Sequence, residues 1–130
     1  MFGLQWLMDH GALPKYRAEE YYASYVAGIF RTVRYGLAQA HGRAEMMEFN
    51  YLVEQKAVMN KDVKYVVDYN RIPAALAQLT KELLTIEATG DRARAANWLK
   101  RYDQMPPSLT GALESAKGVP VDVDPKFAME

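Results

Sequence analysis

The chain has 130 residues, of which 50% are hydrophobic and 25% charged, a composition typical of a single folded domain. Its 16 basic and 16 acidic residues give no net charge, which argues against a nucleic-acid-binding protein, and no apolar run approaches the roughly 20 residues of a membrane span. The absence of cysteine excludes disulfides, thiolate metal sites and a cysteine nucleophile. It also fits a reducing compartment, and we expect a cytoplasmic protein.

The first predicted element is a short apolar helix over residues 2–8, which Gly11 ends because glycine readily adopts the left-handed conformation that follows a helix. No Ser, Thr, Asp or Asn precedes this helix to cap its first turn. An uncapped start inside an apolar pattern has two explanations: the chain is a piece excised from a longer protein, or the helix is a frayed N-terminus. The pattern alone does not choose between them.

A long helix is predicted after Pro14, because apolar residues recur at spacings of three and four. They are Tyr22, Val26, Ile29, Val33 and Leu37, and Tyr21, Tyr25 and Phe30 widen the stripe. Gly36 and Gly42 then bracket His41, and two glycines this close together predict a kink, a helix break or a close backbone approach. The helical pattern resumes over residues 46–53.

The period then changes to that of strands. Residues 58–59 and 63–67 are rich in β-branched side chains and flank the polar loop Asn60-Lys61-Asp62, which predicts a β-hairpin. A lone hairpin is marginally stable in water, so we expect this one to pack on the helices or on another domain.

Three helices are predicted after the hairpin. The first has Asp68 or Asn70 as its N-cap, Pro73 in its first turn, and an apolar stripe of Ile72, Leu76, Leu79, Leu83 and Ile86. Gly90 ends it and Asp91 caps the second, which presents Ala95, Trp98, Leu99 and Tyr102 and keeps Arg92, Arg94, Lys100 and Arg101 on a solvated face. The third starts at Pro107 or Ser108 and ends near Gly118, and residues 119–125 are extended. The fold class is therefore mainly α, a bundle of about five or six helices with one small β-hairpin.

Few residues are candidates for chemistry. The sequence has no phosphate-binding loop, no dinucleotide fingerprint, no nucleophile elbow and no HExxH zinc motif. His41 and Glu45 are one helical turn apart and, with Glu48, would make a metal site, but such pairs arise often by chance and Gly42 weakens the helix between them. The simpler interpretation of His41 is a hydrogen-bonded histidine at a helix junction, and that of His10 is a cap at a helix C-terminus.

Three segments carry a resemblance to a known family: Gln39-Ala40-His41, Phe49-Asn50-Tyr51-Leu52, and LTIEATGD at residues 84–91. With the sequence around them, from about residue 2 to residue 127 and including VPVDVDP at 119–125, they resemble the C-terminal part of the dipeptidyl-peptidase III family, and more narrowly its bacterial members. The resemblance implies a two-lobed zinc exopeptidase that removes dipeptides from the N-termini of short peptides. Its catalytic lobe is mostly helical.

The same resemblance implies where the zinc belongs. The family holds zinc with two histidines of an HExxGH motif and a glutamate of a following EExxA(D/E) motif, and neither motif occurs in this chain. Because both lie upstream in the resembling proteins, residues 1–130 are expected to be one helical domain excised from the C-terminal part of a larger peptidase. The parent protein would bind zinc, and this fragment would hold no metal or other cofactor.

One functional residue carries over by motif. His41 matches the family's active-site histidine, which implies that it binds substrate and stabilises the transition state. The chain departs from some relatives at Glu45, where they have a basic residue, and a basic residue expected near the chain end aligns only loosely with Lys126. Peptide specificity and dipeptide release therefore stay open.

Two functions remain from the sequence. The chain is the C-terminal helical part of a zinc peptidase, which supplies His41 and a packing surface to the upstream catalytic lobe and a peptide substrate but is inactive alone. Alternatively, it is a free-standing, non-catalytic helical interaction module that shares ancestry with the peptidases. An excised piece would expose apolar surface where its missing lobe packs, which makes a homodimer of the isolated chain an expected state.

Overall fold

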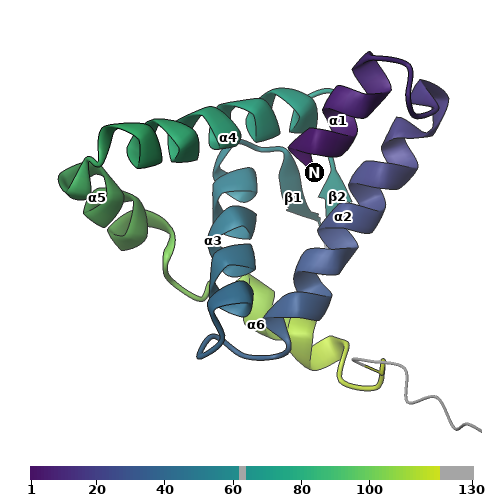
Figure 1. Cartoon of the computed structure of the whole chain (residues 1–130). Helices are drawn as coiled ribbons and strands as arrows, with labels where there is room; N and C mark the ends of the chain where they lie inside the picture. Colours follow the sequence, from purple (N-terminus) through teal and green to yellow (C-terminus); the bar gives the residue numbers. More distant parts are fainter. Residues whose placement is uncertain (62–63, 121–130) are drawn as a thin grey trace, which may run out of the picture.

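The computed structural model describes residues 1–61 and 64–120 (Figure 1). In chain order the elements are α1 (Phe2–Asp9), the 3-10 helix η1 (Lys15–Arg17), α2 (Ala18–Val33), α3 (Ala40–Glu54), β1 (Val58–Lys61), β2 (Lys64–Val67), α4 (Ile72–Thr89), α5 (Arg92–Tyr102) and α6 (Pro107–Ser115). The predicted mainly α fold with one antiparallel hairpin is confirmed. Most of the predicted extended tail, from residue 121 onward, and Lys126 lie outside the described residues.

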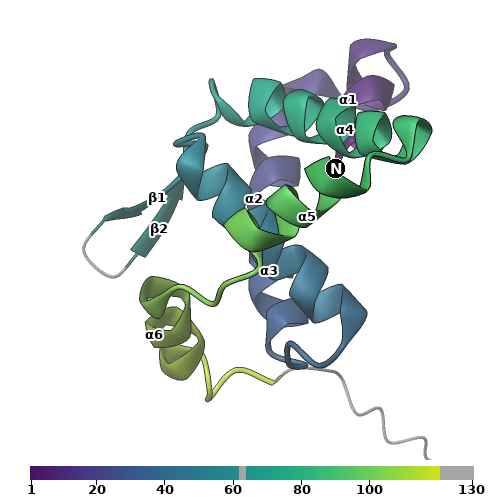
Figure 2. The ribbon, with the colours of Figure 1, turned by 90° about the vertical axis from the view of Figure 1, so that its left-hand side faces the viewer.

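Helices α2 and α3 form the centre of the molecule and make its most extensive helix–helix contact. They meet at the turn of residues 34–39 and diverge from it, while α1 and α4 lie across their far ends (Figure 1). The view turned by 90° shows the hairpin projecting to one side of α3 and α6 lying apart from the upper helices (Figure 2). No helix of the described residues is both long enough and apolar enough to cross a bilayer.

The hydrophobic core is one cluster of side chains contributed by the helices and by the hairpin. Its most deeply buried members are Ile29 of α2, Met46, Phe49 and Leu52 of α3, Val58 of β1, Ile72 of α4 and Leu109 of α6. The α2 stripe is buried as predicted, except that Leu37 is not part of the helix. Helix α2 ends at Val33 and Gly36 follows with a φ of 99°, so Leu37 reaches the core from the turn instead.

The hairpin packs on the central helices, as expected for a pair of strands that is unstable alone. Its pairs are Val58–Val67, Met59–Val66, Asn60–Tyr65 and Lys61–Lys64. Asn60 and Lys61 therefore belong to β1 rather than to the predicted loop, and Asp62 and Val63 lie outside the described residues. The Tyr65 ring contacts Phe30 of α2 and Phe49 of α3, with centroid distances of 5.1 and 5.2 Å. These aromatic contacts attach β2 to the α2–α3 pair.

The apolar stripe predicted for α4 lies on the helix, but it is buried over the first half alone. Leu76 and Leu79 are buried, whereas Leu83 is 45% exposed and Ile86 is only half-buried. The reason is visible in Figure 1, where the second half of α4 extends beyond α3 towards α5. Periodicity predicts which face of a helix is apolar, but not how far along the helix its partners reach.

Contacts between residues close in sequence form the turn before α4 and the corner between α4 and α5. Asp68 Oδ1 accepts hydrogen bonds from the backbone N–H groups of Asn70 (3.0 Å) and Arg71 (3.1 Å), which closes the turn before α4. The N-cap of α4 is Arg71 and no side chain caps the helix, so the predicted N-caps Asp68 and Asn70 are both wrong. Gly90 adopts the left-handed conformation with a φ of 61°, and Asp91 Oδ1 accepts from the Arg94 N–H at 2.9 Å. Both predicted signals at the α4–α5 junction are confirmed, and α1 begins without a side-chain cap, as predicted.

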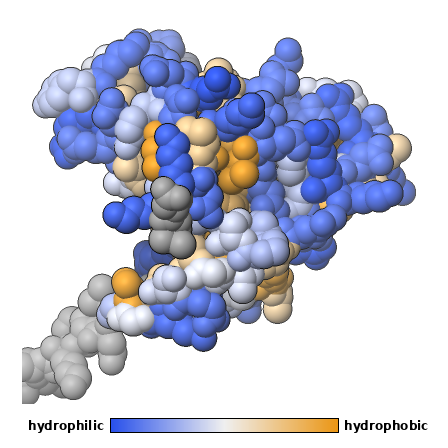
Figure 3. Space-filling view, turned by 180° about the vertical axis from the view of Figure 1, so that it is seen from behind, coloured by the Kyte–Doolittle hydropathy of each residue, from blue (hydrophilic) through white to orange (hydrophobic). Residues whose placement is uncertain are grey.

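Apolar side chains are also exposed. On α1 they are Phe2, Leu4 and Trp6, and on α4 they are Leu83 and Leu84. A groove of about 480 Å³ is lined by Phe2 of α1 and by α4 residues between Ala77 and Thr89. The face of the molecule that is turned away from the viewer in Figure 1 is mostly hydrophilic, with hydrophobic atoms gathered near its middle (Figure 3).

Candidate functional site

His41 lies in the first turn of α3, where the chain returns from α2. Its side chain is exposed and has no hydrogen-bonding partner among residues 1–61 and 64–120. His10 differs: its Nδ1 donates to the carbonyl oxygen of Trp6 at 2.8 Å, and its ring stacks on the Trp6 ring with centroids 3.9 Å apart. His10 therefore closes the end of α1, as predicted. The hydrogen-bonded role predicted for His41 as the simpler interpretation is not seen in the described chain.

Backbone packing holds the turn that carries His41. A Cβ built on Gly42 would lie 2.5 Å from the carbonyl oxygen of Gly36 and 3.3 Å from that of Thr32. Only glycine fits at such a position without a shift of the backbone. The first turn of α3 thus rests directly on the end of α2, and the helix break and the close approach predicted for the two glycines are both confirmed.

A charged pair holds the same end of α3 against the C-terminal end of α5. Arg43 Nε donates to Asp103 Oδ1 at 2.8 Å, and Arg43 Nη2 donates to Asp103 Oδ2. The hydrogen bond from Arg43 keeps the pKa of the Asp103 carboxyl below its ordinary value. The two residues that follow His41 therefore hold the first turn of α3, Gly42 by its contact with the backbone of residues 32 and 36 and Arg43 by its pair with Asp103.

The Phe49-Asn50-Tyr51-Leu52 segment has a structural role. Asn50 Nδ2 donates to the carbonyl oxygens of Tyr102 and Gln104, each at 2.7 Å, and so ties α3 to the end of α5. The Tyr51 ring packs against Trp98 and Tyr102, with centroid distances of 5.4 and 5.6 Å. Phe49 and Leu52 are buried in the core.

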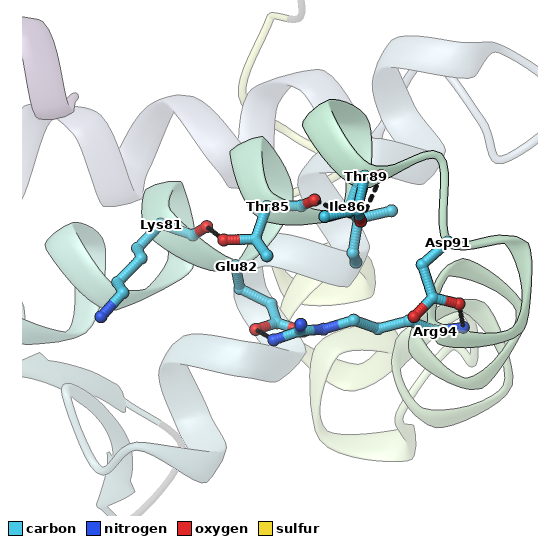
Figure 4. A network of polar contacts seen from close by, with 7 residues as sticks. All are labelled: Lys81, Glu82, Thr85, Ile86, Thr89, Asp91 and Arg94. Carbon is cyan, nitrogen blue, oxygen red and sulfur yellow. Dashed lines mark hydrogen bonds and ion pairs between the residues drawn. The ribbon is translucent and has the colours of Figure 1, made fainter.

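The LTIEATGD segment is likewise explained by the fold. The hydroxyls of Thr85 and Thr89 donate to backbone oxygens one turn back, and Gly90 and Asp91 make the corner between α4 and α5 (Figure 4). Two of the three most specific segments thus build structure. In the third, Gln39-Ala40-His41, the histidine side chain is left exposed and unused by the fold.

Glu45, one turn after His41, is a half-buried carboxyl whose Oε2 is buried without a hydrogen-bonding partner. Burial raises its pKa, as does the charge of Glu48, while the Met1 ammonium group and His41 oppose the rise. The described residues contain no cluster of three or more His, Asp or Glu side chains able to hold a metal ion. The alternative metal site of His41, Glu45 and Glu48 is therefore not formed in this arrangement.

Two ion pairs between helices have no signal in the sequence pattern. Arg94 of α5 pairs with Glu82 of α4, and Arg101 of α5 pairs with Glu54 of α3. Both arginines are exposed, as predicted for a solvated face, and each guanidinium is also held by a carboxylate. The partners are 12 and 47 residues away along the chain, so no helical spacing could have indicated them.

The fold matches one part of known peptidase structures. It superposes on dipeptidyl-peptidase III from Corallococcus sp. strain EGB with a TM-score of 0.87 at 34% sequence identity, and on DPP III from Caldithrix abyssi with a TM-score of 0.91 at 30% identity. The matches cover 96% and 97% of this chain and 24% of each of those chains. The chain therefore has the fold of about a quarter of a dipeptidyl-peptidase III molecule.

A curated relative has a different name. Nudix hydrolase 3 of Arabidopsis thaliana is 38% identical over 132 residues, which cover 99% of this chain and 17% of that protein. No family model matches the chain. The chain thus spans well under a third of each of these relatives.

Proposed function

We propose that the chain is the C-terminal helical domain of a cytoplasmic zinc peptidase like dipeptidyl-peptidase III, in which His41 binds substrate and stabilises the transition state. The observation that supports this is the placement of His41. It is an exposed histidine without a hydrogen bond, on a turn that backbone packing holds fixed, in a fold shared with dipeptidyl-peptidase III.

The proposed chemistry follows from that placement. An imidazole N–H aimed at the peptide carbonyl oxygen would stabilise the negative charge that develops when water attacks the carbonyl carbon. The N-terminal end of α3 adds a partial positive charge beside it. A donor helps most when it needs no rearrangement during the reaction, and the glycine contact beneath His41 supplies that rigidity. The zinc would belong to the upstream lobe, where the resembling proteins have the HExxGH and EExxA(D/E) motifs that hold it.

The test uses the intact protein, with the upstream lobe that the proposal requires. His41→Ala is expected to lower kcat/KM for a short peptide with a free N-terminus by roughly 10²–10³-fold, the cost of removing one transition-state donor. His10→Ala, which removes the chain's other histidine, is the matched control and is expected to keep wild-type activity. Wild-type activity in His41→Ala would remove His41 from the mechanism.

The isolated 130-residue chain supplies a second test. It is expected to cleave no peptide and to bind no stoichiometric zinc, measured by mass spectrometry under native conditions after dialysis against zinc. Stoichiometric zinc that is lost in His41→Ala would instead revive a metal site at His41, Glu45 and Glu48.

The non-catalytic interaction module remains the second candidate, because of the apolar groove between α1 and α4. The gene separates the two functions: HExxGH and EExxA(D/E) motifs upstream of this segment support the peptidase, and their absence supports the module. The plant relative's name does not count against the peptidase, since the matched segment is 17% of that protein. If the exposed apolar surface pairs two copies of the isolated chain, sedimentation will show a dimer that the intact protein lacks.

A further inference from the structure

A second surface lies where α3, α4 and α5 meet. A recess of about 470 Å³ opens there, within the usual size range of small-molecule sites. Its lining combines aromatic rings with arginine, glutamate and amide side chains. We call it the α3–α5 recess. Its α3 residues lie ten or more positions after His41, roughly 15 Å along the helix, so its surroundings are separate from those of His41.

Three aromatic side chains form the apolar part of the α3–α5 recess. The Trp98 ring lies 4.4 Å from the Tyr102 ring and 5.4 Å from the Tyr51 ring, measured between centroids. Tyr51 and Tyr102 are buried, whereas Trp98 is only half-buried. Trp98 therefore offers the accessible ring surface, on a support that two buried rings hold in place.

Two arginines form the charged part. Arg94 Nε and Nη2 donate to the two carboxylate oxygens of Glu82, and Arg101 Nε and Nη2 donate to those of Glu54, at 3.0 and 2.7 Å. In both pairs the same edge of the guanidinium is used, as Figure 4 shows for Arg94. A guanidinium has five N–H donors, and within residues 1–61 and 64–120 no hydrogen bond uses the Nη1 atom of either arginine. The carboxylates raise the pKa of both arginines, which therefore stay charged.

These features specify a ligand. The two arginines and two glutamates of the recess carry no net charge together, so no long-range electrostatic field attracts an anion. Recognition of an anionic ligand therefore depends on hydrogen bonds with the open guanidinium edges. Arginine edges match the planar geometry of a carboxylate, and an exposed indole face matches a flat ring. We propose that the α3–α5 recess binds an aromatic carboxylate, with its ring on Trp98 and its carboxylate at the open edges of Arg94 and Arg101.

The test follows the indole N–H signals of the chain by two-dimensional NMR. The chain has two tryptophans, and Trp6, on the exposed face of α1, serves as an internal control. Phenylacetate is expected to shift the Trp98 signal saturably and to leave the Trp6 signal unchanged. Phenethylamine, which has the ring with the opposite charge, and inorganic phosphate, which lacks the ring, are each expected to bind at least about tenfold more weakly. Equal shifts of both indoles, or equal binding of phenethylamine, would overturn the proposal.

Matched variants separate recognition from folding. Arg94→Gln and Arg101→Gln are each expected to weaken phenylacetate binding at least about tenfold, whereas Arg92→Gln, on the same helix but outside the recess, is expected to bind like wild type. If a glutamine variant unfolds, Arg94→Lys keeps the charge next to Glu82 but loses the guanidinium fork, and it is expected to bind more weakly than wild type. Wild-type binding by folded Arg94→Lys and Arg101→Lys would contradict the assigned roles.

Two sources of the ligand are distinguished with peptides. An aromatic carboxylate is either a small free acid or the C-terminal residue of a peptide. Tighter binding of Gly-Gly-Phe than of phenylacetate identifies the peptide C-terminus, and the reverse identifies the free acid. Gly-Gly-Phe-amide lacks the carboxylate, so equal binding of the amide and the acid would overturn the proposal.

Discussion

The carbonyl oxygen of Gly36 lies 2.5 Å from the point at which a Cβ on Gly42 would stand. This contact joins the turn after α2 to the first turn of α3 through backbone atoms alone. Side chains move between rotamers, whereas two backbones in contact can separate only if a helix shifts. The position of His41, next to Gly42 in sequence, is therefore set by the packing of the two central helices.

Gly42→Ala is expected to destabilise the chain. The new methyl group would overlap the Gly36 carbonyl oxygen, and overpacking of this kind costs about 1–3 kcal/mol. The free energy of unfolding, measured with urea, is expected to fall by that amount. On the proposed function, the peptidase activity of the intact protein falls with it because His41 moves.

Gly28→Ala is the matched control, because Gly28 lies within α2 with no atom near the position of a Cβ. Alanine is the better helix former by about 0.8–1 kcal/mol, so this variant is expected to be at least as stable as wild type. If Gly42→Ala is as stable as Gly28→Ala, α2 and α3 separate at little cost in free energy, and the packing argument for Gly42 is wrong.

Asn50→Ala is expected to loosen the end of α5. The variant loses both hydrogen bonds to the Tyr102 and Gln104 carbonyls, and each such bond is worth about 0.5–1.5 kcal/mol net. Urea unfolding measures the loss, and hydrogen exchange is expected to show reduced protection mainly in α5. Asn97→Ala, an exposed position on α5, is the control and is expected to change the free energy of unfolding by less than about 0.5 kcal/mol.

Glu45→Gln is expected to change how stability depends on pH. Burial raises the pKa of Glu45 in the folded chain above its unfolded value, so the folded state favours the protonated carboxyl. Wild type therefore loses stability as the pH rises from below 4.5 through the raised pKa, a cost that glutamine does not carry. The variant is expected to be more stable than wild type at pH 7 and equal to it below about pH 4, measured by urea unfolding at each pH. If the difference in unfolding free energy between the variant and wild type is the same at all pH values, titration of Glu45 is not its cause.

His41→Ala is expected to leave the stability of the isolated chain unchanged within about 0.5 kcal/mol, because the side chain is exposed and makes no hydrogen bond in the described structure. Thermal unfolding of the variant against wild type checks this. A clear loss of stability would mean that the fold uses His41, which would restore the interpretation of His41 as a structural histidine.

Local chemistry explains what the sequence predicted well. The stop at Gly90, the cap at Asp91 and the break between Gly36 and Gly42 depend on backbone conformations within a few residues, so the sequence contains the information needed. The buried face of α2 was also predicted correctly, since the spacing of its apolar residues alone identifies that face.

Long-range contacts were beyond the sequence pattern. Nothing in the spacing of residues indicates that Asn50 meets the end of α5, that Arg101 meets Glu54, or that the stripe of α4 loses its partners after Leu79. The same limit applies to the candidate site. The bracketing glycines pointed to His41, but the exposure of its side chain and its lack of a hydrogen bond needed the three-dimensional arrangement.

The corner between α4 and α5 is held differently from the rest of the molecule. No residue between Leu79 and Tyr102 is buried, and the Glu82–Arg94 pair is the ion pair that links the two helices there. Exposed ion pairs weaken with salt, whereas buried apolar contacts do not. The corner should therefore behave as its own cooperative opening unit, with amide exchange that quickens as ionic strength rises while the α2–α3 core stays protected.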